Sequence, residues 1–301
     1  MPQSTLPVLQ NVANLRDVAS STGFPTLRPG LLLRSAAPDD ATPDDRDLLA
    51  TEIGLKTIID LRSDTEHRDV TKKSALRVPP VPDPPLRTHS GQDHIDHADP
   101  QNPYRVPGVT YELINFNGSA YTSHLIWQLS YLNIAKLLTW YMLGYSNDAI
   151  AIIATNVMRK RGLVGLAQDS LTYCKTEVKL VFDVLAKEKN YPLLVHCTQG
   201  KDRTGLVILL VLMLLGVEAS AIERDYMLSQ EGLAPDREER VKAITKVGFP
   251  AEFVDCAKDW TQTVIATIEN EHGGIEAYLT SCEVDLAQQK RVRDILSQDI
   301  A

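Results

Sequence analysis

The stretch that decides the fold is Val195-His196-Cys197-Thr198-Gln199-Gly200-Lys201-Asp202-Arg203-Thr204-Gly205. The apolar residues 192–195 before the cysteine follow a turn-like Lys-Asn-Tyr and predict a buried strand. Residues 206–217 are almost wholly apolar and predict a buried helix that ends near Gly216. A cysteine therefore closes a strand, a short loop follows, and a helix begins at or just before Arg203. The loop N–H groups and the positive end of the helix converge on one point, which suits a bound phosphate.

The side chains of this loop predict nucleophilic chemistry. A thiol attacks well only as a thiolate, and a helix N-terminus with nearby cations favours that form. Cys197 has such cations in Lys201 and Arg203. Arg203 is expected to fold over the loop and to present two parallel donors to phosphate oxygens, where they stabilise the transition state. We expect Thr204 to donate a hydrogen bond to the sulfur, and His196 to orient the loop through backbone contacts rather than to act as a base.

The other three cysteines lack this setting. A buried cysteine is often only a small apolar side chain, so its context must decide whether it is reactive. None of the three has an arginine six positions later: Cys174, Cys256 and Cys282. The strand–loop–helix context therefore singles out Cys197.

The pattern His-Cys-X5-Arg-Thr-Gly resembles the signature of the cysteine-dependent protein tyrosine phosphatase superfamily. The variant Gly-Lys-Asp-Arg-Thr-Gly at 200–205 is similar to its bacterial and fungal branch, whose members dephosphorylate phosphotyrosine and, in some cases, phosphoserine, phosphothreonine or phosphoinositides. Further blocks resemble that branch and leave residues ~70–110 as the clearest gap: Asn-Leu-Arg-Asp at 14–17, Arg-Pro-Gly at 28–30, Leu-Arg-Ser at 33–35, Ile-Ile-Asp-Leu-Arg-Ser at 58–63 with Glu66, Arg-Asp-Tyr-Met-Leu-Ser at 224–229 and Glu-Ala-Tyr-Leu at 276–279.

The resemblance implies an α/β fold: a mostly parallel central sheet flanked by helices, in a single domain over residues 1–301. It also implies hydrolysis of phosphate monoesters through a cysteinyl-phosphate intermediate, with no metal or other cofactor. Cys197 is the expected nucleophile, and Arg203 with the loop amides is expected to hold the phosphoryl oxygens. The candidate substrate-binding residues are Thr198, Gln199, Gly200, Lys201, Thr204 and Arg62.

The general acid is the least determined part of the site. The leaving oxygen needs a proton, usually from an aspartate. Similar enzymes often carry this aspartate on a loop after the strand that corresponds to residues 113–116, but residues 115–118 contain no carboxylate. Asp202 is therefore the candidate acid in the first step and base in the second, with positioning of the loop as its alternative role. If Asp202 does not serve, three aspartates further along the chain are candidates: Asp93, Asp96 and Asp99.

Two upstream arginines have two interpretations each. Arg62 follows a β-branched run that is expected to form a central strand, whose C-terminal end faces the cysteine loop. It is a candidate to hold that loop or a substrate, and a structural ion pair with Asp60 or Glu66 is the alternative. Arg16 and Asp17 are expected to pair with each other, either on the pocket floor or as a surface salt bridge of little energetic value.

Two segments differ in composition from the rest. Residues ~69–108 are rich in Pro, His and Asp and predict an extended loop, whose His/Asp cluster we interpret as solvated rather than metal-binding. Residues ~125–166 are rich in helix formers and aromatic residues and predict a helical lid that gates the pocket. Part of the core is the alternative, and contact with lipid or a partner protein is a further interpretation of the apolar surface. A strand is expected at 111–116, and helices are expected at 39–49, 171–187, 219–229, 238–247, 251–268 and 275–300.

Composition limits the function classes. A chain of 301 residues with 44% hydrophobic and 23% charged residues fits a soluble globular protein. A net charge of −8 argues against a general nucleic-acid or membrane-surface binder, and the apolar runs are too short for stable membrane insertion. Four cysteines make no disulfide framework, and no secretory signal is visible at the N-terminus. A cytoplasmic location is therefore expected.

The substrate and two other classes stay open at this point. A phosphorylated protein is the first candidate and a phosphoinositide the second. Lys201 adds a cation, as in lipid phosphatases of the superfamily, but Thr198 stands where a second lysine would be expected. An arsenate reductase or sulfur carrier would need a resolving cysteine, for which Cys174 is the candidate. A non-catalytic phosphate-recognition module is conceivable because the loop aspartate is missing.

Overall fold

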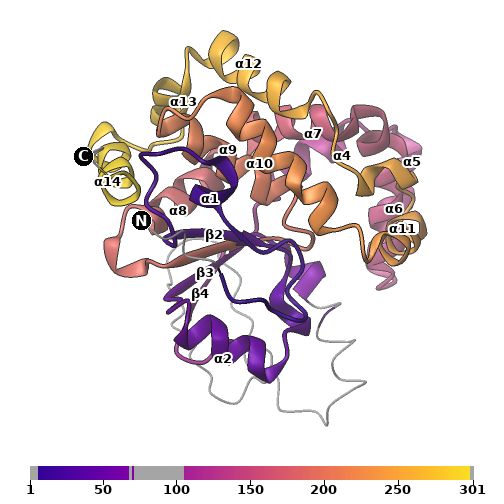
Figure 1. Ribbon diagram of the computed structural model, residues 1–301. Coiled ribbons are helices and arrows are strands. Elements are labelled where there is room, and N and C mark those ends of the chain that lie inside the picture. The colour runs from indigo at the N-terminus through magenta and orange to yellow at the C-terminus, as the bar shows by residue number, and fades with distance from the viewer. Residues whose placement is uncertain (1–5, 68–69, 71–104, 299–301) are drawn as a thin grey trace.

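The computed structural model describes residues 6–67, 70 and 105–298 (Figure 1). Within this part of the chain a five-stranded sheet has the order β1-β2-β5-β3-β4. β5 lies at the centre, parallel to β2 and β3, while β4 is parallel to β3 and β1 is antiparallel to β2. The strands are β1 (Arg16–Asp17), β2 (Leu32–Ser35), β3 (Thr57–Asp60), β4 (Thr110–Leu113) and β5 (Leu193–His196). The expected α/β fold with a mostly parallel sheet is confirmed.

Both faces of the sheet are covered, which explains why β2, β3 and β5 are buried along their whole length. Alternate residues of β5 face opposite sides. Leu193 and Val195 belong to a large core beneath the C-terminal helices, whereas Leu194 belongs to a smaller core with Leu49 of α2 (Pro43–Thr51). Figure 1 shows α2 on one side of the sheet and α1, α8, α9 and α10 on the other.

The helix after the cysteine loop is α9 (Asp202–Leu214), and it lies in the large core. The predicted start near Arg203 is confirmed to within one residue, and Gly216, at φ +75°, follows the helix end. The chain then continues through α10 (Ala219–Gly232) and α11 (Arg237–Lys246). Since parallel strands end at one edge of a sheet, residue 197 lies at the edge where β2, β3 and β5 all end.

Three expected helices are interrupted. The helix expected at 171–187 is broken at Cys174, which separates α7 (Arg159–Tyr173) from α8 (Lys175–Leu185). The helix expected at 251–268 is instead a short 3-10 helix, η4 (Ala251–Val254), and a separate α12 (Trp260–His272). The third divides into α13 (Ile275–Ser281) and α14 (Leu286–Leu296), because Glu283 adopts φ +65° and Asp285 caps the new helix by accepting a hydrogen bond from the Gln288 amide.

The remaining elements connect these parts. Thr42 and Asp45 form a capping box at the start of α2, so the expected helix begins at Pro43 and only a 3-10 turn precedes it. The other elements are α1 (Val18–Thr22), η1 (Pro38–Asp40), α4 (Ser119–Trp127), α5 (Tyr131–Met142), α6 (Ser146–Ile153), η2 (Ala154–Met158) and η3 (Glu188–Asn190). No helix of the described residues combines the length and the apolar character that crossing a membrane requires.

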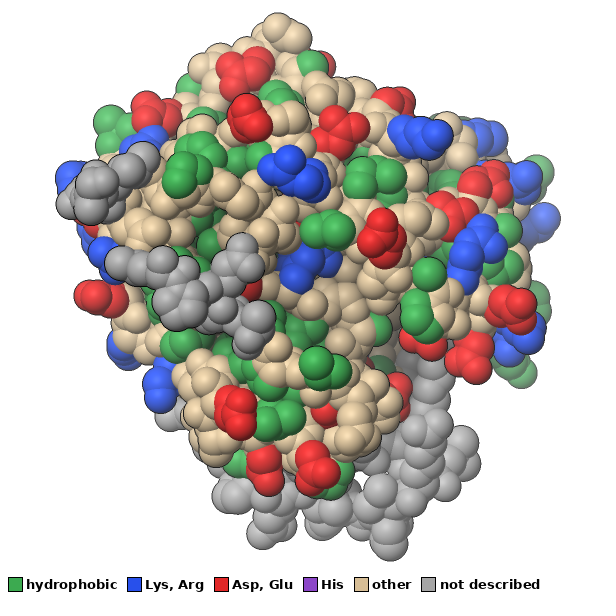
Figure 2. Space-filling view, viewed as in Figure 1, with side chains coloured by type: hydrophobic (Ala, Val, Ile, Leu, Met, Phe, Trp, Pro, Cys, Tyr) green, Lys and Arg blue, Asp and Glu red, His purple; other side chains and the backbone are tan. Residues whose placement is uncertain are grey.

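The two segments of unusual composition differ in what the structure describes. Most of the Pro/His/Asp-rich segment, with Asp93, Asp96 and Asp99, lies outside the described residues. The segment 125–166 forms the end of α4, α5, α6, η2 and the start of α7. α5 and α6 pack mainly on each other, whereas α7 packs on α9 and α12. On the face drawn in Figure 2, Asp and Glu side chains are interspersed with Lys and Arg.

A buried ion cluster joins the sheet edge to α10. Asp225, which is 1% exposed, lies 2.9 Å from Nε of Arg16 and 2.5 Å from Nη1 of Arg34. Burial alone would raise the pKa of Asp225, but the charges of Arg34 and Arg16 outweigh it and lower the pKa. The expected pair between Arg16 and Asp17 is wrong, because Asp17 instead caps α1 by accepting hydrogen bonds from the amides of residues 19 and 20.

We expect Asp225→Ala to lower the free energy of unfolding by about 3–5 kcal/mol, because it leaves two arginines buried without their counter-ion. The matched control is Asp294→Ala, which breaks an exposed pair with Lys290 and is expected to change stability by less than about 0.5 kcal/mol. Urea unfolding of both variants measures the difference. Equal stabilities would show that the cluster contributes nothing beyond a surface pair.

Candidate active site

Residues 197–201 form the loop between β5 and α9, and this loop packs closely on the end of β2. Cys197 follows β5 directly and is buried. Gly200 has φ +64°, and a Cβ atom there would lie 1.9 Å from the carbonyl oxygen of Ser35, so only glycine fits. The Ala37 amide also donates to the carbonyl oxygen of Thr198 at 3.2 Å. The close approach of β2 therefore fixes the path of the loop.

Side chains from outside the loop donate hydrogen bonds to its carbonyl groups. Asn14 Nδ2 donates to the carbonyl oxygens of Gln199 and Gly200, each at 3.1 Å. Arg34 Nη2 donates to the carbonyl oxygen of Gly200 at 2.8 Å. Arg16 in turn holds Asn14, because its Nη1 donates to Asn14 Oδ1 at 2.5 Å. In a planar trans peptide the N–H points opposite to the C=O, so the amides that follow these carbonyls face away from Asn14 and Arg34.

Arg203 is held by a bidentate ion pair. Its Nη1 and Nη2 donate to the two carboxylate oxygens of Glu66, each at 2.7 Å, and Nη1 also donates to the carbonyl oxygen of Leu61 at 3.1 Å. A guanidinium has five N–H donors. The other two, Nε–H and one Nη2–H, form one edge and bond to no described residue. That edge can donate two parallel hydrogen bonds to the oxygens of a phosphate.

Glu66 is the shared partner of Arg203 and the loop. The Thr198 hydroxyl donates to its Oε1, and the amide and hydroxyl of Ser63 donate to its Oε2 at 3.0 and 2.9 Å. Burial by itself would raise the pKa of Glu66, but the charge of Arg203 and these hydrogen bonds outweigh it and hold the pKa far below the ordinary 4.5. Glu66 is therefore ionised at neutral pH and positions Arg203 and Thr198 together.

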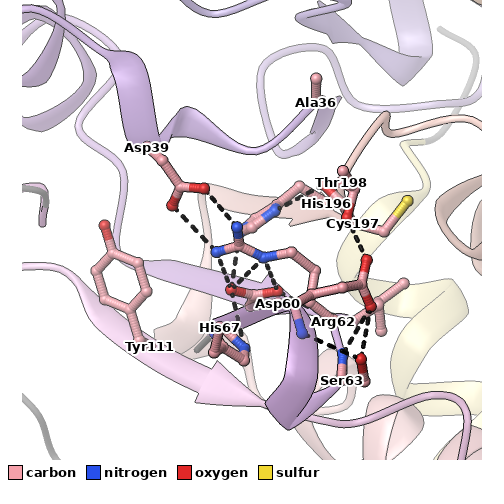
Figure 3. Close-up of polar contacts among 12 residues, drawn as sticks. Ala36, Asp39, Asp60, Arg62, Ser63, His67, Tyr111, His196, Cys197 and Thr198 are labelled. Atoms are coloured by element: carbon pink, nitrogen blue, oxygen red, sulfur yellow. Dashed lines mark hydrogen bonds and ion pairs between the residues drawn. The ribbon is translucent and has the colours of Figure 1, made fainter. Parts of the chain in front are cut away.

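A second charged cluster lies beside the cysteine (Figure 3). Arg62 donates to Asp60 through Nε at 3.0 Å and Nη2 at 2.8 Å, and also to Asp39. Of the two interpretations of Arg62, this geometry matches the structural pair with Asp60, and the partner that sequence did not suggest is Asp39. His196 lies 3.6 Å from Asp60 through Nε2, while its Nδ1 lies 3.2 Å from the carbonyl oxygen of Cys197.

Burial keeps His196 neutral. The pKa of its imidazole is lowered mainly by burial, against an opposing effect of Asp60. For Asp60 burial alone would raise the pKa, but the charge of Arg62 and its hydrogen bonds outweigh burial and lower the pKa well below its usual range. The neutral ring contacts the backbone at Cys197, which is the arrangement expected for a residue that orients the loop.

Lys201, the last residue of the loop, and Asp202, the first residue of α9, have different surroundings. Lys201 is fully buried, and its Nζ donates to the carbonyl oxygens of Phe253 at 3.2 Å and Asp255 at 2.8 Å. Its ammonium also lies 3.0 Å from Oδ1 of Asp202, whose side chain is 42% exposed. The lysine thus ties the loop to the segment after α11, and the carboxylate of Asp202 is reachable by solvent.

The other loop side chains have separate environments. Thr204 is fully buried, and its hydroxyl has no hydrogen-bond partner among the described residues. That hydroxyl is free for the predicted bond to sulfur. Gln199 Oε1 accepts from Nη1 of Arg240 at 3.5 Å. Cys174, the candidate resolving cysteine, is buried, and burial raises the pKa of its thiol, so it stays protonated.

Sequence reasoning assigned no role to three residues that hold the loop: Asn14, Arg34 and Asp225. Their only signal in the sequence was membership in the blocks quoted for the family resemblance, which gave no hint of their partners. Glu66 was named only as an alternative partner of Arg62, whereas the structure pairs it with Arg203. In the described part of the chain, no three His, Cys, Asp or Glu side chains are grouped so that they could hold a metal ion.

Comparison with known proteins gives one family and several relatives. The family model described as tyrosine phosphatase family matches residues 7–298. The chain is 26% identical to the triple specificity protein phosphatase PtpB of Mycobacterium tuberculosis, over 94% of this chain and 96% of that protein. It is 31% identical to a tyrosine-protein phosphatase of Nostoc commune over 42% of this chain and 47% of that protein. A putative tyrosine-protein phosphatase of Cupriavidus necator is 33% identical over 32% of this chain and 37% of that protein.

We expect Glu66→Gln to lower the free energy of unfolding at pH 7 by about 1–3 kcal/mol, because it removes the charged acceptor of Arg203. The pKa of Glu66 is lowered by folding, so its stabilising contribution is complete above the ordinary pKa of 4.5 and declines as the pH falls below that value. The stability difference between the wild type and Glu66→Gln should therefore shrink on acidification. Chemical denaturation across this pH range measures it, and a constant difference would contradict the ion pair.

Proposed function

The chain belongs to the tyrosine phosphatase family, and we propose that it hydrolyses phosphotyrosine in proteins, with phosphoserine and phosphothreonine as further substrates. The observation that carries this proposal is the arrangement around the loop. The carbonyl groups of Gln199 and Gly200 are bonded on one side, so amide donors converge on the other. The open edge of Arg203 adds a fork of two N–H groups. Together they form a rigid set of donors for a phosphoryl group.

The first chemical step forms a bond from Cys197 Sγ to phosphorus and breaks the bond from phosphorus to the ester oxygen. Arg203 and the loop amides stabilise the charge on the phosphoryl oxygens. Asp202 gives its proton to the departing oxygen, which leaves as an alcohol or phenol. The unpartnered hydroxyl of Thr204 donates to the sulfur and stabilises the thiolate.

The second step regenerates the thiolate. A water molecule attacks phosphorus, Asp202 accepts its proton, and the bond from sulfur to phosphorus breaks to release inorganic phosphate. His196 takes no proton in this scheme, since it is buried and its pKa is lowered. Glu66 acts through Arg203 and is a positioning residue, because both its oxygens are already bonded within the protein.

The surroundings of Lys201 support a phosphoprotein as the first substrate. A phosphoinositide headgroup carries several phosphates and is bound by cations in the pocket, but the ammonium of Lys201 is buried against two carbonyl oxygens and Asp202. The name of the Mycobacterium relative, triple specificity protein phosphatase, supports including more than one phosphorylated side chain among the substrates.

Phosphate release from phosphotyrosine peptides tests the proposal. We expect turnover by the wild type that is insensitive to chelators, and a loss of at least roughly 10^4-fold in Cys197→Ser, because serine is not ionised at neutral pH. The matched control is Cys256→Ser, a half-buried cysteine outside the loop, which should keep its turnover. Turnover of phosphoserine peptides and of phosphoinositides, compared with that of phosphotyrosine peptides, ranks the substrates. Activity retained in Cys197→Ser, or no activity on any phosphopeptide, would refute the proposal.

The leaving group tests the role of Asp202. We expect Asp202→Asn to slow hydrolysis of an alkyl phosphate by roughly 10^2-fold or more, because its leaving oxygen needs a proton. An activated aryl phosphate such as p-nitrophenyl phosphate leaves without this help and should be slowed far less. Steady-state rates with both substrates measure the ratio. Equal slowing of the two would assign Asp202 to positioning of the loop instead.

A further inference from the structure

Exposed hydrophobic side chains concentrate on one short stretch of the chain. Among the described residues, nine of the twelve large hydrophobic side chains that are exposed fall within residues 127–145, and their exposure ranges from 40% to 90%. A soluble protein seldom exposes so contiguous an apolar surface unless something binds to it. We call these nine the hairpin patch: Trp127, Tyr131, Leu132, Leu138, Trp140, Tyr141, Met142, Leu143 and Tyr145.

Apart from Trp127, which ends α4, the patch lies on α5 and on the turn that joins it to α6, in a helical hairpin at the edge of the molecule. α5 and α6 pack mainly on each other, and Figure 1 shows both at the edge of the fold, away from the sheet. Gly144, at φ +82°, lies in the turn between them. Within α5 only Leu137 is buried against the described residues. The described part of the chain therefore leaves the outer face of α5 and the tip of the hairpin uncovered.

The composition of the patch fits the surface of a lipid bilayer. Five of its nine members are Trp or Tyr, whose rings combine an apolar body with a polar tip and are enriched at the boundary between lipid and water. α5 has 12 residues and α6 has 8, too few for either to span a membrane. Short helices with an exposed apolar face lie in the plane of the interface instead.

The charge around the hairpin is opposite in sign to that of the whole chain. Residues 119–158 contain one cation, Lys136, and one carboxylate, Asp148, and the run Arg159-Lys160-Arg161 follows at once. Residues 119–161 therefore carry a net charge of +3, and the rest of the chain carries −11. A second copy of this protein would bring the same cations and the same acidic body. Anionic lipid headgroups attract the cations beside the hairpin and repel the acidic rest of the chain.

We propose that the hairpin patch docks on an anionic lipid bilayer, with its Trp and Tyr rings among the headgroups and Lys136, Arg159 and Lys160 beside the lipid phosphates. The net charge of −8 argued against binding to membrane surfaces in general. That argument averages the charge over the whole chain, whereas docking depends on the sign of the charge at the contact surface. The inference does not rest on the proposed catalytic function, since it concerns residues outside the cysteine loop.

Sedimentation of the full chain with vesicles tests the docking. We expect binding to phosphatidylcholine vesicles that contain phosphatidylserine, weaker binding to phosphatidylcholine alone, and weakening by salt. Trp260 is buried, so a blue shift of tryptophan fluorescence on binding would come from Trp127 and Trp140. At constant ionic strength inorganic phosphate should not compete, because the cysteine loop is not the contact. No binding to anionic vesicles, or displacement by phosphate, would overturn the proposal.

Variants locate the contact. The triple change Tyr131→Ser, Leu132→Ser and Met142→Ser should reduce binding by at least about tenfold. The change Leu286→Ser, at an apolar residue of α14 that is 62% exposed and lies outside the patch, should not. Lys160→Gln should reduce binding to the anionic vesicles by roughly fivefold and leave the neutral ones unchanged. Thermal unfolding confirms that each variant is folded. Unchanged vesicle binding by the triple variant would refute the hairpin patch as the lipid contact. If the wild type binds no lipid but self-associates, and the triple change abolishes that self-association, the hairpin patch would be a contact between two copies of this protein.

Discussion

The site depends on the direction in which the peptide groups of residues 199–201 face. Asn14 and Arg34 bond their carbonyl oxygens from the sheet side, and the planar peptide then directs the following amides to the opposite side. A loop of free peptides would have to reorganise these dipoles each time an anion arrived. Here the donors are already aimed, which is how a protein stabilises charge without a reorganisation cost.

Two sets of ion pairs keep that arrangement in place, one buried around Asp225 and one half-buried between Glu66 and Arg203. Asp225 holds the two arginines behind the loop, and Glu66 holds the arginine in front of it. Both carboxylates have lowered pKa values, because their cationic partners outweigh the effect of burial. Such pairs contribute less to net stability than to geometry, since desolvation offsets much of their attraction. The pair with Glu66 fixes Nη1 and Nη2 of Arg203, and the open edge of its guanidinium, Nε–H and one Nη2–H, is thereby held in a fixed position.

The order of strand, loop and α9 followed from the sequence because it depends on local patterns: a fully apolar run, a glycine-containing loop and a long buried helix. The interruptions at Cys174, at residues 255–259 and at Glu283 did not follow. The break at Glu283 is local and is set by its positive φ and by the Asp285 cap, whereas residue 255 is held by a long-range contact with Lys201. An apolar pattern shows neither. The expected pairing of Arg16 with Asp17 was wrong because each has another partner: Arg16 binds Asp225 of α10, and Asp17 caps α1.

The sequence by itself determined the order of strand, cysteine loop and helix, because the cysteine, the arginine six residues later and the helix that follows are close in the chain and need few long-range contacts to meet. The tertiary structure alone decided what holds them. Asn14, Arg34, Glu66 and Asp225 are separated from the loop or from their partners by long stretches of sequence. The pairing of β1, β2, β5 and β3 and the packing of α10 on α1 bring them together. Side-chain types specify possible partners, but the fold selects the actual ones.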